Sequence, residues 1–436
     1  MAAFAYNLLL LLALPLIFFG YVWRVFVTRK ASESWRANLG ALPNLANRDQ
    51  GKKLVWMHAA SVGEVIASQP VLDALRDRLQ HVMVLLTTIT QTGNEVARNS
   101  PRRADVVSYF PLDLPPIVRA ALNRVMPDVF VMVETEIWPN FLAFAKRLGI
   151  PTILVNGRIS DKSFQRGRRW RWLLGWAVRN IDYCCMQSKL DAERIIQLGA
   201  RPESVRVLGN TKFDQEGAHL NDDEVRRLRA ELGIPENSPV FIAGSTNPGE
   251  EGEVLRAFRR IRESVPDLRL IIAPRQIERS DEIEGIACQM GFSCARRSSR
   301  ARESEYDVLI LDTFGELAAV YSVACVTFVG GSLIPKGGHS IFQPIIQGKP
   351  VMFGPYMHNF RDISHQAIAA GIGFEVHNDQ EMASVAKMLM ADERRLTEIK
   401  ASCEKLVMEN RGASERYADL IATVLARDLD VHEFAD

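Results

Sequence analysis

Acidic side chains stand just beyond the ends of two apolar, strand-like runs in the first half of the chain. Glu64 follows the run Leu54–His58 and begins a helical pattern, so it could take a proton from a hydroxyl group. An acid in the first turn of a helix also stabilises the helix dipole, and this structural interpretation stays open for Glu64. Glu134 and Glu136 follow the run Val129–Val133 and predict either a polar acceptor site or a helix cap.

A third strand-like run, Thr152–Val155, is followed by Asn156 and Arg158. Three consecutive strands of a parallel sheet would then send polar side chains to one edge, where open α/β sheets bind their ligands. This repetition favours a functional site over three separate helix caps. Ser61 and Gly63, between the first run and its helix, belong to the same candidate site.

Glycines and hydroxyl side chains end two strand-like runs in the second half of the chain. Ser245 ends one run, and Gly330, Gly331 and Ser332 end another. Such residues are expected to leave backbone N–H groups free for phosphate oxygens. Neither segment has the GxxxxGK[ST] pattern of a P-loop or the GxGxxG pattern of a dinucleotide site.

Two further segments of the second half could meet an anion. Arg275 follows the run Leu268–Ala273, where its guanidinium could pair with a phosphate or with a structural acid. Gly338 and His339 precede the helical stretch Ile341–Gln347, whose first N–H groups could also bind an anion.

The composition argues against several other functions. The chain has 436 residues, with 53 Lys and Arg against 52 Asp and Glu, so its net charge of +1 does not favour nucleic acid. Its eight His are scattered and its six Cys show no CxxC pair, so no metal site is predicted. The sequence indicates no disulfide framework, which suits a reducing compartment. There is no Gly-x-Ser-x-Gly pattern of a serine hydrolase.

Alternating β-branched runs and helical patterns must position these residues. The first set of runs predicts a doubly wound parallel sheet, and a second set after the polar stretch Phe213–Asp223 predicts another α/β domain. We expect the two domains to face each other across a cleft at the carboxyl ends of both sheets. The expected strands are Leu54–His58, Val82–Thr87, Val106–Tyr109, Val129–Val133, Thr152–Val155, Ile181–Met186, Val205–Leu208, Val240–Ala243, Leu268–Ala273, Val308–Leu311, Val326–Val329 and Pro350–Phe353.

The first 23 residues carry no charge and include the nearly continuous apolar run Leu8–Phe19. This segment is long enough to cross a bilayer, and the first basic residue follows it, unlike in a cleaved signal peptide. It therefore predicts a single-pass anchor, and a buried core helix is the alternative. Four basic residues and one acid, Glu33, follow the apolar run, so the positive-inside rule predicts that the rest of the chain lies in the cytoplasm. The basic residues are Arg24, Arg29, Lys30 and Arg36.

Residues 158–180 hold seven Lys or Arg and one acid, interleaved with Trp170, Trp172 and Trp176. A basic, Trp-rich helical segment is suited to the surface of an anionic membrane. Nucleic acid is the competing interpretation, but the anchor favours the membrane. A solvated helix with its Trp side chains in the core is the structural alternative.

A helical stretch near Glu393–Arg427 is long enough to pack back across the hinge. The predicted domains are a membrane anchor (1–30), an N-terminal Rossmann-like domain (31–215), a C-terminal Rossmann-like domain (216–405) and a C-terminal helix that packs back on the N-terminal domain (406–436).

With these residues in view, the chain resembles the Kdo transferases, membrane-anchored glycosyltransferases that add 3-deoxy-D-manno-octulosonic acid (Kdo) to the lipid A precursor. The resemblance covers nearly the whole chain, beginning with the N-terminal anchor. It rests on blocks that occur in the family's order: His58-Ala59-Ala60-Ser61-Val62-Gly63-Glu64, Glu134-Thr135-Glu136-Ile137-Trp138-Pro139-Asn140, Asn156-Gly157-Arg158-Ile159-Ser160, Gly209-Asn210-Thr211-Lys212-Phe213-Asp214, Ala273-Pro274-Arg275, Gly330-Gly331-Ser332-Leu333, Gly337-Gly338-His339 and Gly354-Pro355-Tyr356.

The resemblance implies an α/β fold of the GT-B type, with CMP-Kdo bound by the C-terminal domain and a lipid A precursor by the N-terminal domain. It implies lipopolysaccharide biosynthesis at the inner membrane, inversion at the anomeric carbon, no metal ion and no cofactor apart from the CMP-sugar substrate. Glu64 would be the general base. The implied donor-binding residues are Ser245, Arg275, Gly330, Gly331, Ser332, Gly338, His339 and Gln343, and the acceptor-binding residues are Ser61, Gly63, Glu134, Glu136, Asn156, Arg158 and Lys212.

Two blocks depart from the family pattern. The segment Gln276-Ile277-Glu278-Arg279 stands where the family usually has His-x-Glu-Arg, and Ser340-Ile341-Phe342-Gln343-Pro344 stands where it usually has Asn-x-x-Glu-Pro. The missing Glu commonly accepts hydrogen bonds from the donor ribose, and Gln343 retains an oxygen without the charge. The alternatives are a GT-B transferase with another nucleotide sugar and a membrane-held protein that binds nucleotide or lipid without turnover.

Overall fold

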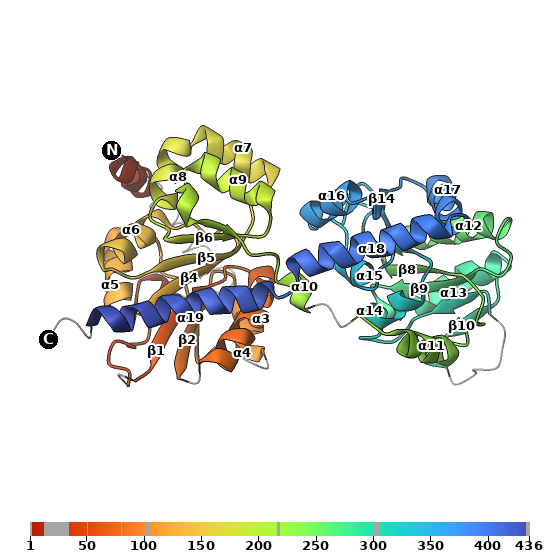
Figure 1. Cartoon of the computed structure of the whole chain (residues 1–436), viewed down its shortest axis with the longest axis horizontal. Coiled ribbons are helices and arrows are strands. Elements are labelled where there is room, and N and C mark those ends of the chain that lie inside the picture. Colours follow the sequence, from red (N-terminus) through yellow and green to blue (C-terminus); the bar gives the residue numbers. More distant parts are fainter. Residues whose placement is uncertain are drawn as a thin grey trace. The chain divides into compact units, whose positions relative to one another are not determined.

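The computed structural model of the chain describes residues 2–12, 35–49, 51–79, 81–100, 104–215, 219–299 and 306–432. The chain forms two compact α/β units (Figure 1). The N-terminal unit comprises Met1–Asp214 and Asn410–Asp436, and the C-terminal unit comprises Gln215–Glu409. The chain passes from the first unit to the second within the polar stretch Phe213–Asp223.

A seven-stranded parallel sheet forms the centre of the N-terminal unit. Its strands are β1 (Lys53–His58), β2 (Val82–Thr88), β3 (Val106–Tyr109), β4 (Val129–Val133), β5 (Thr152–Gly157), β6 (Tyr183–Met186) and β7 (Val205–Val207). They lie in the order β3-β2-β1-β4-β5-β6-β7. Strand β5 runs two residues further than expected, so Asn156 belongs to the strand itself and does not follow it.

Helices cover both faces of this sheet, which is why its strands are apolar on both sides. One face is covered by α3 (Val62–Arg78), α4 (Gln91–Asn99) and α19 (Ala413–His432), and the other by α5 (Pro115–Val125), α6 (Pro139–Arg147), α8 (Arg171–Val178) and α9 (Lys189–Leu198). Because side chains alternate along a strand, Met57 joins the first core and Trp56 the second. Between residues 35 and 215, the remaining helices are α2 (Trp35–Asn38), α7 (Asp161–Arg169), the 3₁₀ turn η1 (Pro202–Ser204) and α10 (Lys212–Gln215).

A second seven-stranded parallel sheet forms the centre of the C-terminal unit, in the order β10-β11-β9-β8-β12-β13-β14. The strands are β8 (Val240–Thr246), β9 (Arg269–Pro274), β10 (Cys294–Arg296), β11 (Val308–Ile310), β12 (Val326–Val329), β13 (Val351–Phe353) and β14 (Gly373–Glu375). The helices are α11 (Asp222–Glu231), α12 (Glu250–Arg262), η2 (Ile277–Arg279), α13 (Ser280–Gln289), α14 (Leu317–Val320), η3 (Tyr321–Val323), α15 (Phe342–Ile346), α16 (Arg361–Ala369), α17 (Asp379–Met390) and α18 (Glu393–Asn410). The two parallel-sheet units confirm the predicted pair of Rossmann-like domains.

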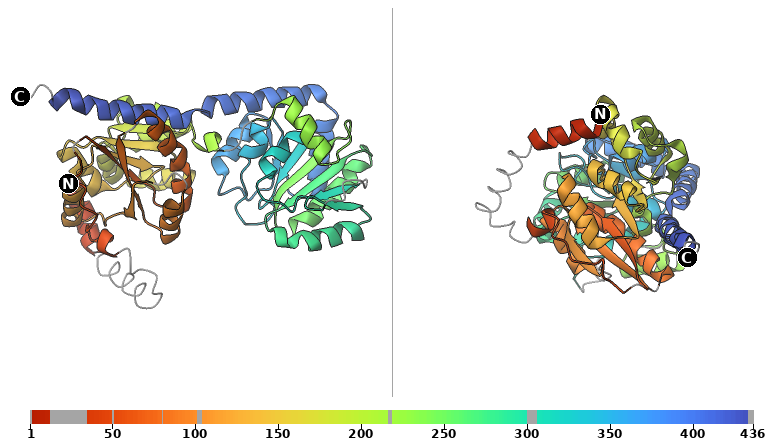
Figure 2. Two further views of the ribbon diagram at one scale, coloured as in Figure 1. Left: turned by 90° about the horizontal axis from the view of Figure 1, so that it is seen from below. Right: turned by 90° about the vertical axis from the view of Figure 1, so that its left-hand side faces the viewer.

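The stretch near Glu393–Arg427 is helical as predicted, and the structure divides it into two helices, α18 and α19. Gly412 adopts a φ of +75°, a conformation that interrupts a right-handed helix. The Asp214 carboxylate then caps the new helix, α19, by accepting the N–H groups of Gly412 at 2.7 Å and Ser414 at 2.8 Å. Helix α19 packs along the N-terminal unit (Figure 2). Its Tyr417 is buried in the core shared with α3.

Residues 2–12 form a helix that bonds to the N-terminal unit. The Tyr6 hydroxyl donates to the Asp113 carboxylate at 2.9 Å. The same carboxylate accepts the N–H groups of Asn140 and Phe141 at the start of α6, at 3.0 and 2.8 Å. Within the described part of the chain, none of the helices combines the length and apolar character needed to cross a membrane. Most of the predicted anchor, residues 13–30, lies outside the described residues.

Candidate functional site

The path of the chain through each sheet points to where a ligand would bind. In the N-terminal sheet, the first strand, β1, lies between β2 and β4. In the C-terminal sheet, the first strand, β8, lies between β9 and β12. Ligands of doubly wound sheets bind beyond the carboxyl ends of the strands at this switch point. The segments that follow β1 and β4 hold Glu64, Glu134 and Glu136. Ser245 belongs to β8 itself, and Gly330, Gly331 and Ser332 follow β12.

Glu64 is the third residue of α3, and its carboxylate is half-buried. One oxygen accepts the N–H of Ala60 at 2.7 Å, and the other accepts the Ser61 hydroxyl at 2.9 Å. Burial, and next the negative charge of Glu136, raise the pKa of Glu64 to about 7, although the two hydrogen bonds oppose the shift. The Glu64 carboxylate therefore bonds to the residues just before its helix, and its raised pKa also allows it to exchange a proton near neutral pH.

Glu134 and Asn156 have backbone φ values of +59° and +54°. Residues other than glycine rarely adopt this left-handed conformation, which costs on the order of 1–3 kcal/mol and is common in functional sites. The surrounding structure holds both residues in place. The Glu134 N–H donates to Val155 O at 2.9 Å, and the Asn156 side-chain oxygen accepts the Thr211 N–H at 3.2 Å.

His58 is the last residue of β1 and was not among the predicted site residues. Its side chain is fully buried and stacks on Phe110, with 3.9 Å between the ring centroids. Its Nε2 atom lies 3.7 Å from Oε2 of Glu136 and has no hydrogen-bond partner among the described residues. A role for His58 could not be predicted, because a single histidine at the end of an apolar strand gives no sequence signal of its own.

The other predicted acceptor residues lie in the same unit. The backbone carbonyl of Arg158 accepts the Thr135 hydroxyl, so the segments after β4 and β5 are bonded to each other. Lys212 is the first residue of α10, and its N–H donates to the Asn210 side chain at 3.0 Å. A Cβ atom at Gly63 would meet no atom within 4 Å, so packing does not require glycine there.

The prediction that Gly330, Gly331 and Ser332 leave their backbone N–H groups free for a phosphate is wrong. The N–H groups of Gly331 and Ser332 donate to the Glu250 carboxylate at 2.7 and 3.0 Å, and that of Gly330 donates to Gly244 O at 2.9 Å. These N–H groups are therefore not free for phosphate oxygens.

The Glu250 side chain, at the start of α12, holds the turn after β12 from within the protein. It is fully buried and also accepts the N–H groups of Asn247 at 3.0 Å and Leu333 at 2.9 Å. Burial raises the pKa of Glu250 against the effect of these bonds. An acid in the first turn of a helix is an ordinary pattern, so this role of Glu250 could not be predicted from the sequence.

His339 offers a hydrogen-bond donor at the switch point of the C-terminal unit. Its Nε2 lies 3.0 Å from the Asn247 amide nitrogen, which also donates to Ser245 O at 3.2 Å. Burial and the nearby Arg275 guanidinium lower the pKa of His339, so the ring is neutral at pH 7. Because Nε2 accepts from Asn247, Nδ1 carries the hydrogen and can donate to an anionic ligand.

The remaining candidates for donor binding belong to several different elements of the C-terminal unit. Arg275 is exposed after β9, and Gln343 is half-buried in the first turn of α15. Gly338 has a φ of +77°, and a Cβ atom there would lie 2.3 Å from the Met357 sulfur, so this position requires glycine. Ser245 has a φ of +56°, in the same left-handed region as Glu134 and Asn156.

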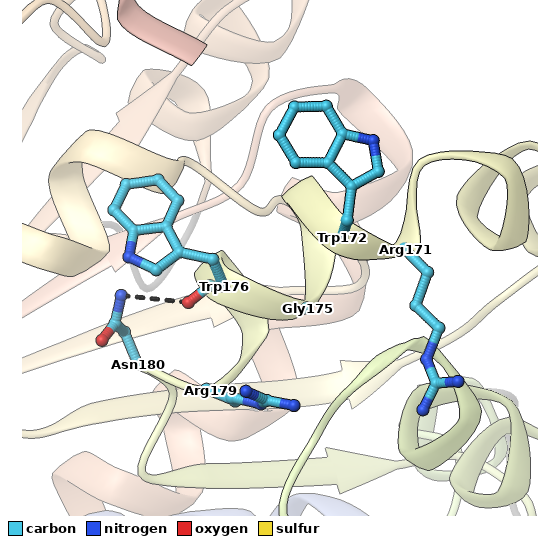
Figure 3. A pocket seen from close by; sticks show the side chains of 6 residues that line it. All are labelled: Arg171, Trp172, Gly175, Trp176, Arg179 and Asn180. Atoms are coloured by element: carbon cyan, nitrogen blue, oxygen red, sulfur yellow. Dashed lines mark hydrogen bonds between the residues drawn. The ribbon is translucent and has the colours of Figure 1, made fainter. Parts of the chain in front are cut away.

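The predicted basic, Trp-rich segment forms the two helices α7 and α8 rather than one. Trp170 and Trp172 are exposed, at 45% and 53%, so their rings are not in the core. A pocket of about 460 Å³ lies on α8 and the residues after it, and Figure 3 shows its side chains together with the hydrogen bond from Asn180 to the Trp176 carbonyl. The pocket is lined by Arg171, Trp172, Gly175, Trp176, Arg179 and Asn180. In the described part of the chain, no three His, Cys, Asp or Glu residues are grouped to hold a metal ion.

Comparison with known proteins gives three findings. Residues 33–215 match the family model described as 3-deoxy-D-manno-octulosonic-acid transferase (kdotransferase). The chain is 32% identical to the 3-deoxy-D-manno-octulosonic acid transferase of Haemophilus influenzae, over 86% of this chain and 88% of that protein. It is 31% identical to a bifunctional glycosyltransferase/methyltransferase of Fusobacterium nucleatum over 92% of this chain, and it spans 61% of that protein's length.

A solved structure shares the fold. The UDP-GlcNAc 2-epimerase from Neisseria meningitidis, bound to UDP-GlcNAc, aligns with 86% of this chain and 100% of its own, at a TM-score of 0.55 and 14% identity. This similarity supports the arrangement of two Rossmann-like domains in one chain.

The pKa of Glu64 predicts a pH-dependent stability. The carboxyl group ionises near 4.5 when exposed and at about 7 in the folded chain, so the folded state binds the proton more tightly between these values. As the pH rises through this window, the wild-type chain should lose stability relative to Glu64→Gln, by up to about 3 kcal/mol. Denaturant unfolding followed by tryptophan fluorescence measures this, because all seven Trp precede residue 214 and report the N-terminal unit. A difference that stays constant with pH would contradict the raised pKa.

Removal of the Glu250 carboxylate should destabilise the C-terminal unit selectively. Glu250→Ala leaves four backbone N–H groups, two of them buried, without their acceptor, so we expect a loss of about 3 kcal/mol or more. Far-UV circular dichroism should show an earlier transition, while tryptophan fluorescence of the N-terminal unit should change little. The exposed Glu278→Ala provides the control. Equal transitions in both variants would mean that the carboxylate does not hold the turn.

Proposed function

The chain belongs to the family of 3-deoxy-D-manno-octulosonic acid (Kdo) transferases, and on this premise we propose that it transfers Kdo from CMP-Kdo to a lipid A precursor. It is a glycosyltransferase, and the proposed reaction contributes to lipopolysaccharide biosynthesis. The N-terminal unit binds the lipid acceptor, and the C-terminal unit binds the nucleotide sugar. The reaction inverts the anomeric carbon and uses neither a metal ion nor a further cofactor.

The observation that carries the proposal is the half-buried Glu64, whose pKa is raised to about 7. A base of this strength is well matched to an operating pH near neutrality. The acceptor hydroxyl attacks the anomeric carbon of Kdo while its proton passes to the Glu64 carboxylate. The bond from that carbon to the CMP phosphate breaks on the opposite side, which inverts the configuration.

The C-terminal unit supplies the groups that stabilise departing CMP. The transition state places negative charge on the phosphate, so fixed cations and hydrogen-bond donors lower its energy. Arg275 provides a guanidinium, and the neutral His339 provides Nδ1–H. Gln343 offers an amide oxygen to the ribose hydroxyls of the donor.

We further propose that the chain is held at the inner membrane by residues 1–30, with both units in the cytoplasm. The exposed Trp170 and Trp172 and the basic side chains of α7 and α8 fit the headgroup region of an anionic membrane. This attachment would keep the N-terminal unit close to its lipid substrate.

Glu64→Gln tests the catalytic part of the proposal. The wild-type chain, given CMP-Kdo and a lipid A precursor, should release CMP, and the variant should release it about 10²–10⁴-fold more slowly because it lacks the base. Unfolding measurements must show that the variant is folded. The exposed Glu236→Gln is the matched control and should keep full activity.

The same assay separates the proposed function from its alternatives. Gln343 favours a different nucleotide, because it offers a neutral oxygen where the family usually has a Glu that accepts hydrogen bonds from the donor ribose. Turnover of another nucleotide sugar but not CMP-Kdo would support that reading. Binding of CMP-Kdo without product under every acceptor condition would support a binding protein, and a fully active Glu64→Gln would remove Glu64 from the mechanism.

A further inference from the structure

We propose that Asn247 is a positioning residue that fixes which ring nitrogen of His339 carries the hydrogen, so that the ring offers Nδ1–H to the phosphate of the nucleotide sugar. The inference rests on the proposed binding of that sugar by the C-terminal unit, and it adds a residue to the site. Asn247 acts through the ring and not by contact with the ligand, because both hydrogens of its amide group have acceptors within the protein. The amide nitrogen lies 3.0 Å from Nε2 of His339 and 3.2 Å from the carbonyl oxygen of Ser245.

The contact with Ser245 sets the orientation of the Asn247 amide group. A carbonyl oxygen only accepts hydrogen bonds, so the amide group must turn its nitrogen toward Ser245. In the reversed orientation the amide oxygen would face the Ser245 oxygen, and neither atom could donate. The same nitrogen has a second hydrogen, which it donates to Nε2 of His339. Nε2 is therefore an acceptor without a hydrogen, and a neutral ring must carry its hydrogen on Nδ1.

The imidazole ring of His339 lies directly against the backbone of Gly331. A Cβ atom at Gly331 would lie 2.9 Å from Cδ2 and 3.0 Å from Nε2 of the ring, so any larger residue would displace it. The carbonyl oxygen of Gly331 also accepts the N–H of Gly338, the residue before His339, at 2.8 Å. One turn therefore holds both the ring and the backbone that leads into it.

A single oxygen of the Glu250 carboxylate joins the two supports of the ring. Oε2 accepts the N–H of Asn247 at 3.0 Å and the N–H of Gly331 at 2.7 Å. Asn247 follows strand β8 and Gly331 follows strand β12, so this oxygen connects the segments after two neighbouring strands. Because the Glu250 side chain is fully buried, its position is set by the core of the unit. The amide group of Asn247 is thus held at a fixed place relative to the ring.

This arrangement leaves one hydrogen-bond donor of the ring for a ligand. Among the described residues, Nδ1 of His339 has no hydrogen-bond partner, and the ring is half-buried. Burial and the charge of Arg275 lower the pKa of His339, so the position of the hydrogen, and not a charge, decides what the ring offers. A ring that already carries its hydrogen on Nδ1 does not have to rearrange when a phosphate binds, which favours affinity.

The first test locates the hydrogen in the full chain without substrate, at about pH 8, where the ring is neutral. Nitrogen-15 label in the histidine rings distinguishes a nitrogen that carries hydrogen from one that does not, and the His339 signals are identified by their loss in His339→Ala. The wild-type chain should show hydrogen on Nδ1 and none on Nε2. In Asn247→Asp a carboxylate, which only accepts, replaces the amide group, so Nε2 should then carry a hydrogen.

The second test asks whether Asn247 acts through the ring. Calorimetry gives the affinity for CMP of the wild-type chain, Asn247→Leu, His339→Ala and the double variant. Asn247→Leu keeps a side chain of similar size without the donor, so CMP should bind about 5–10-fold more weakly. In the His339→Ala background the same replacement should change the affinity no further, because the ring is already absent. The exposed Asn237→Leu in the same unit is the matched control and should bind CMP like the wild-type chain.

Four results would overturn the proposal: hydrogen on Nε2 in the wild-type ring, none on Nε2 in Asn247→Asp, an unchanged affinity for CMP in Asn247→Leu, or effects of Asn247→Leu and His339→Ala that add. The wild-type spectrum needs no variant, so it decides even if the replacements prevent folding. It also needs no ligand. A wild-type chain that shows the predicted hydrogen on Nδ1 but does not bind CMP would count against the proposed function alone.

Discussion

The burial of one carboxyl group, that of Glu64, beside a second acid is the interaction on which this account depends. Removal from water and the charge of Glu136 both favour the protonated form, and the hydrogen bonds from Ala60 and Ser61 favour the ionised form. The balance holds the pKa of Glu64 near 7, where a carboxylate can both accept and release a proton. The sheet maintains this balance, because the adjacent strands β1 and β4 bring the two acids to the same edge.

A glutamate in the first turn of the helix after the first strand occurs in both units, with opposite consequences. Glu250 is fully buried and accepts four backbone N–H groups, so its carboxylate is saturated and holds a turn. Among the described residues, Glu64 accepts one backbone N–H and one hydroxyl, and other acids lie near it. From the sequence, Glu64 could have been an acid that only stabilises its helix. That purely structural role describes Glu250 well, whereas Glu64 has both local hydrogen bonds and a raised carboxyl pKa.

The long apolar runs were enough to predict most strands, because buried parallel strands carry continuous β-branched sequence. The edge strands β10 and β14 were missed, because their sequences, Cys-Ala-Arg and Gly-Phe-Glu, contain no β-branched residue. The helix break at Gly412 depends on Asp214, which lies far away in sequence. Glu64, Glu134, Glu136 and Asn156 could be assigned to one edge from their places at strand ends. The fixed ring of His58 and the turn held by Glu250 could not be predicted, because both depend on contacts that only the folded chain creates.

A crystal structure of the full-length chain with a lipid A precursor bound tests the central claim most directly, because it fixes the position of the attacking hydroxyl relative to one carboxylate. We predict that this hydroxyl lies within hydrogen-bond distance of a Glu64 oxygen, roughly 2.6–3.2 Å. A well-ordered acceptor whose hydroxyl lies beyond the reach of Glu64, or is held by a different acid, would contradict it.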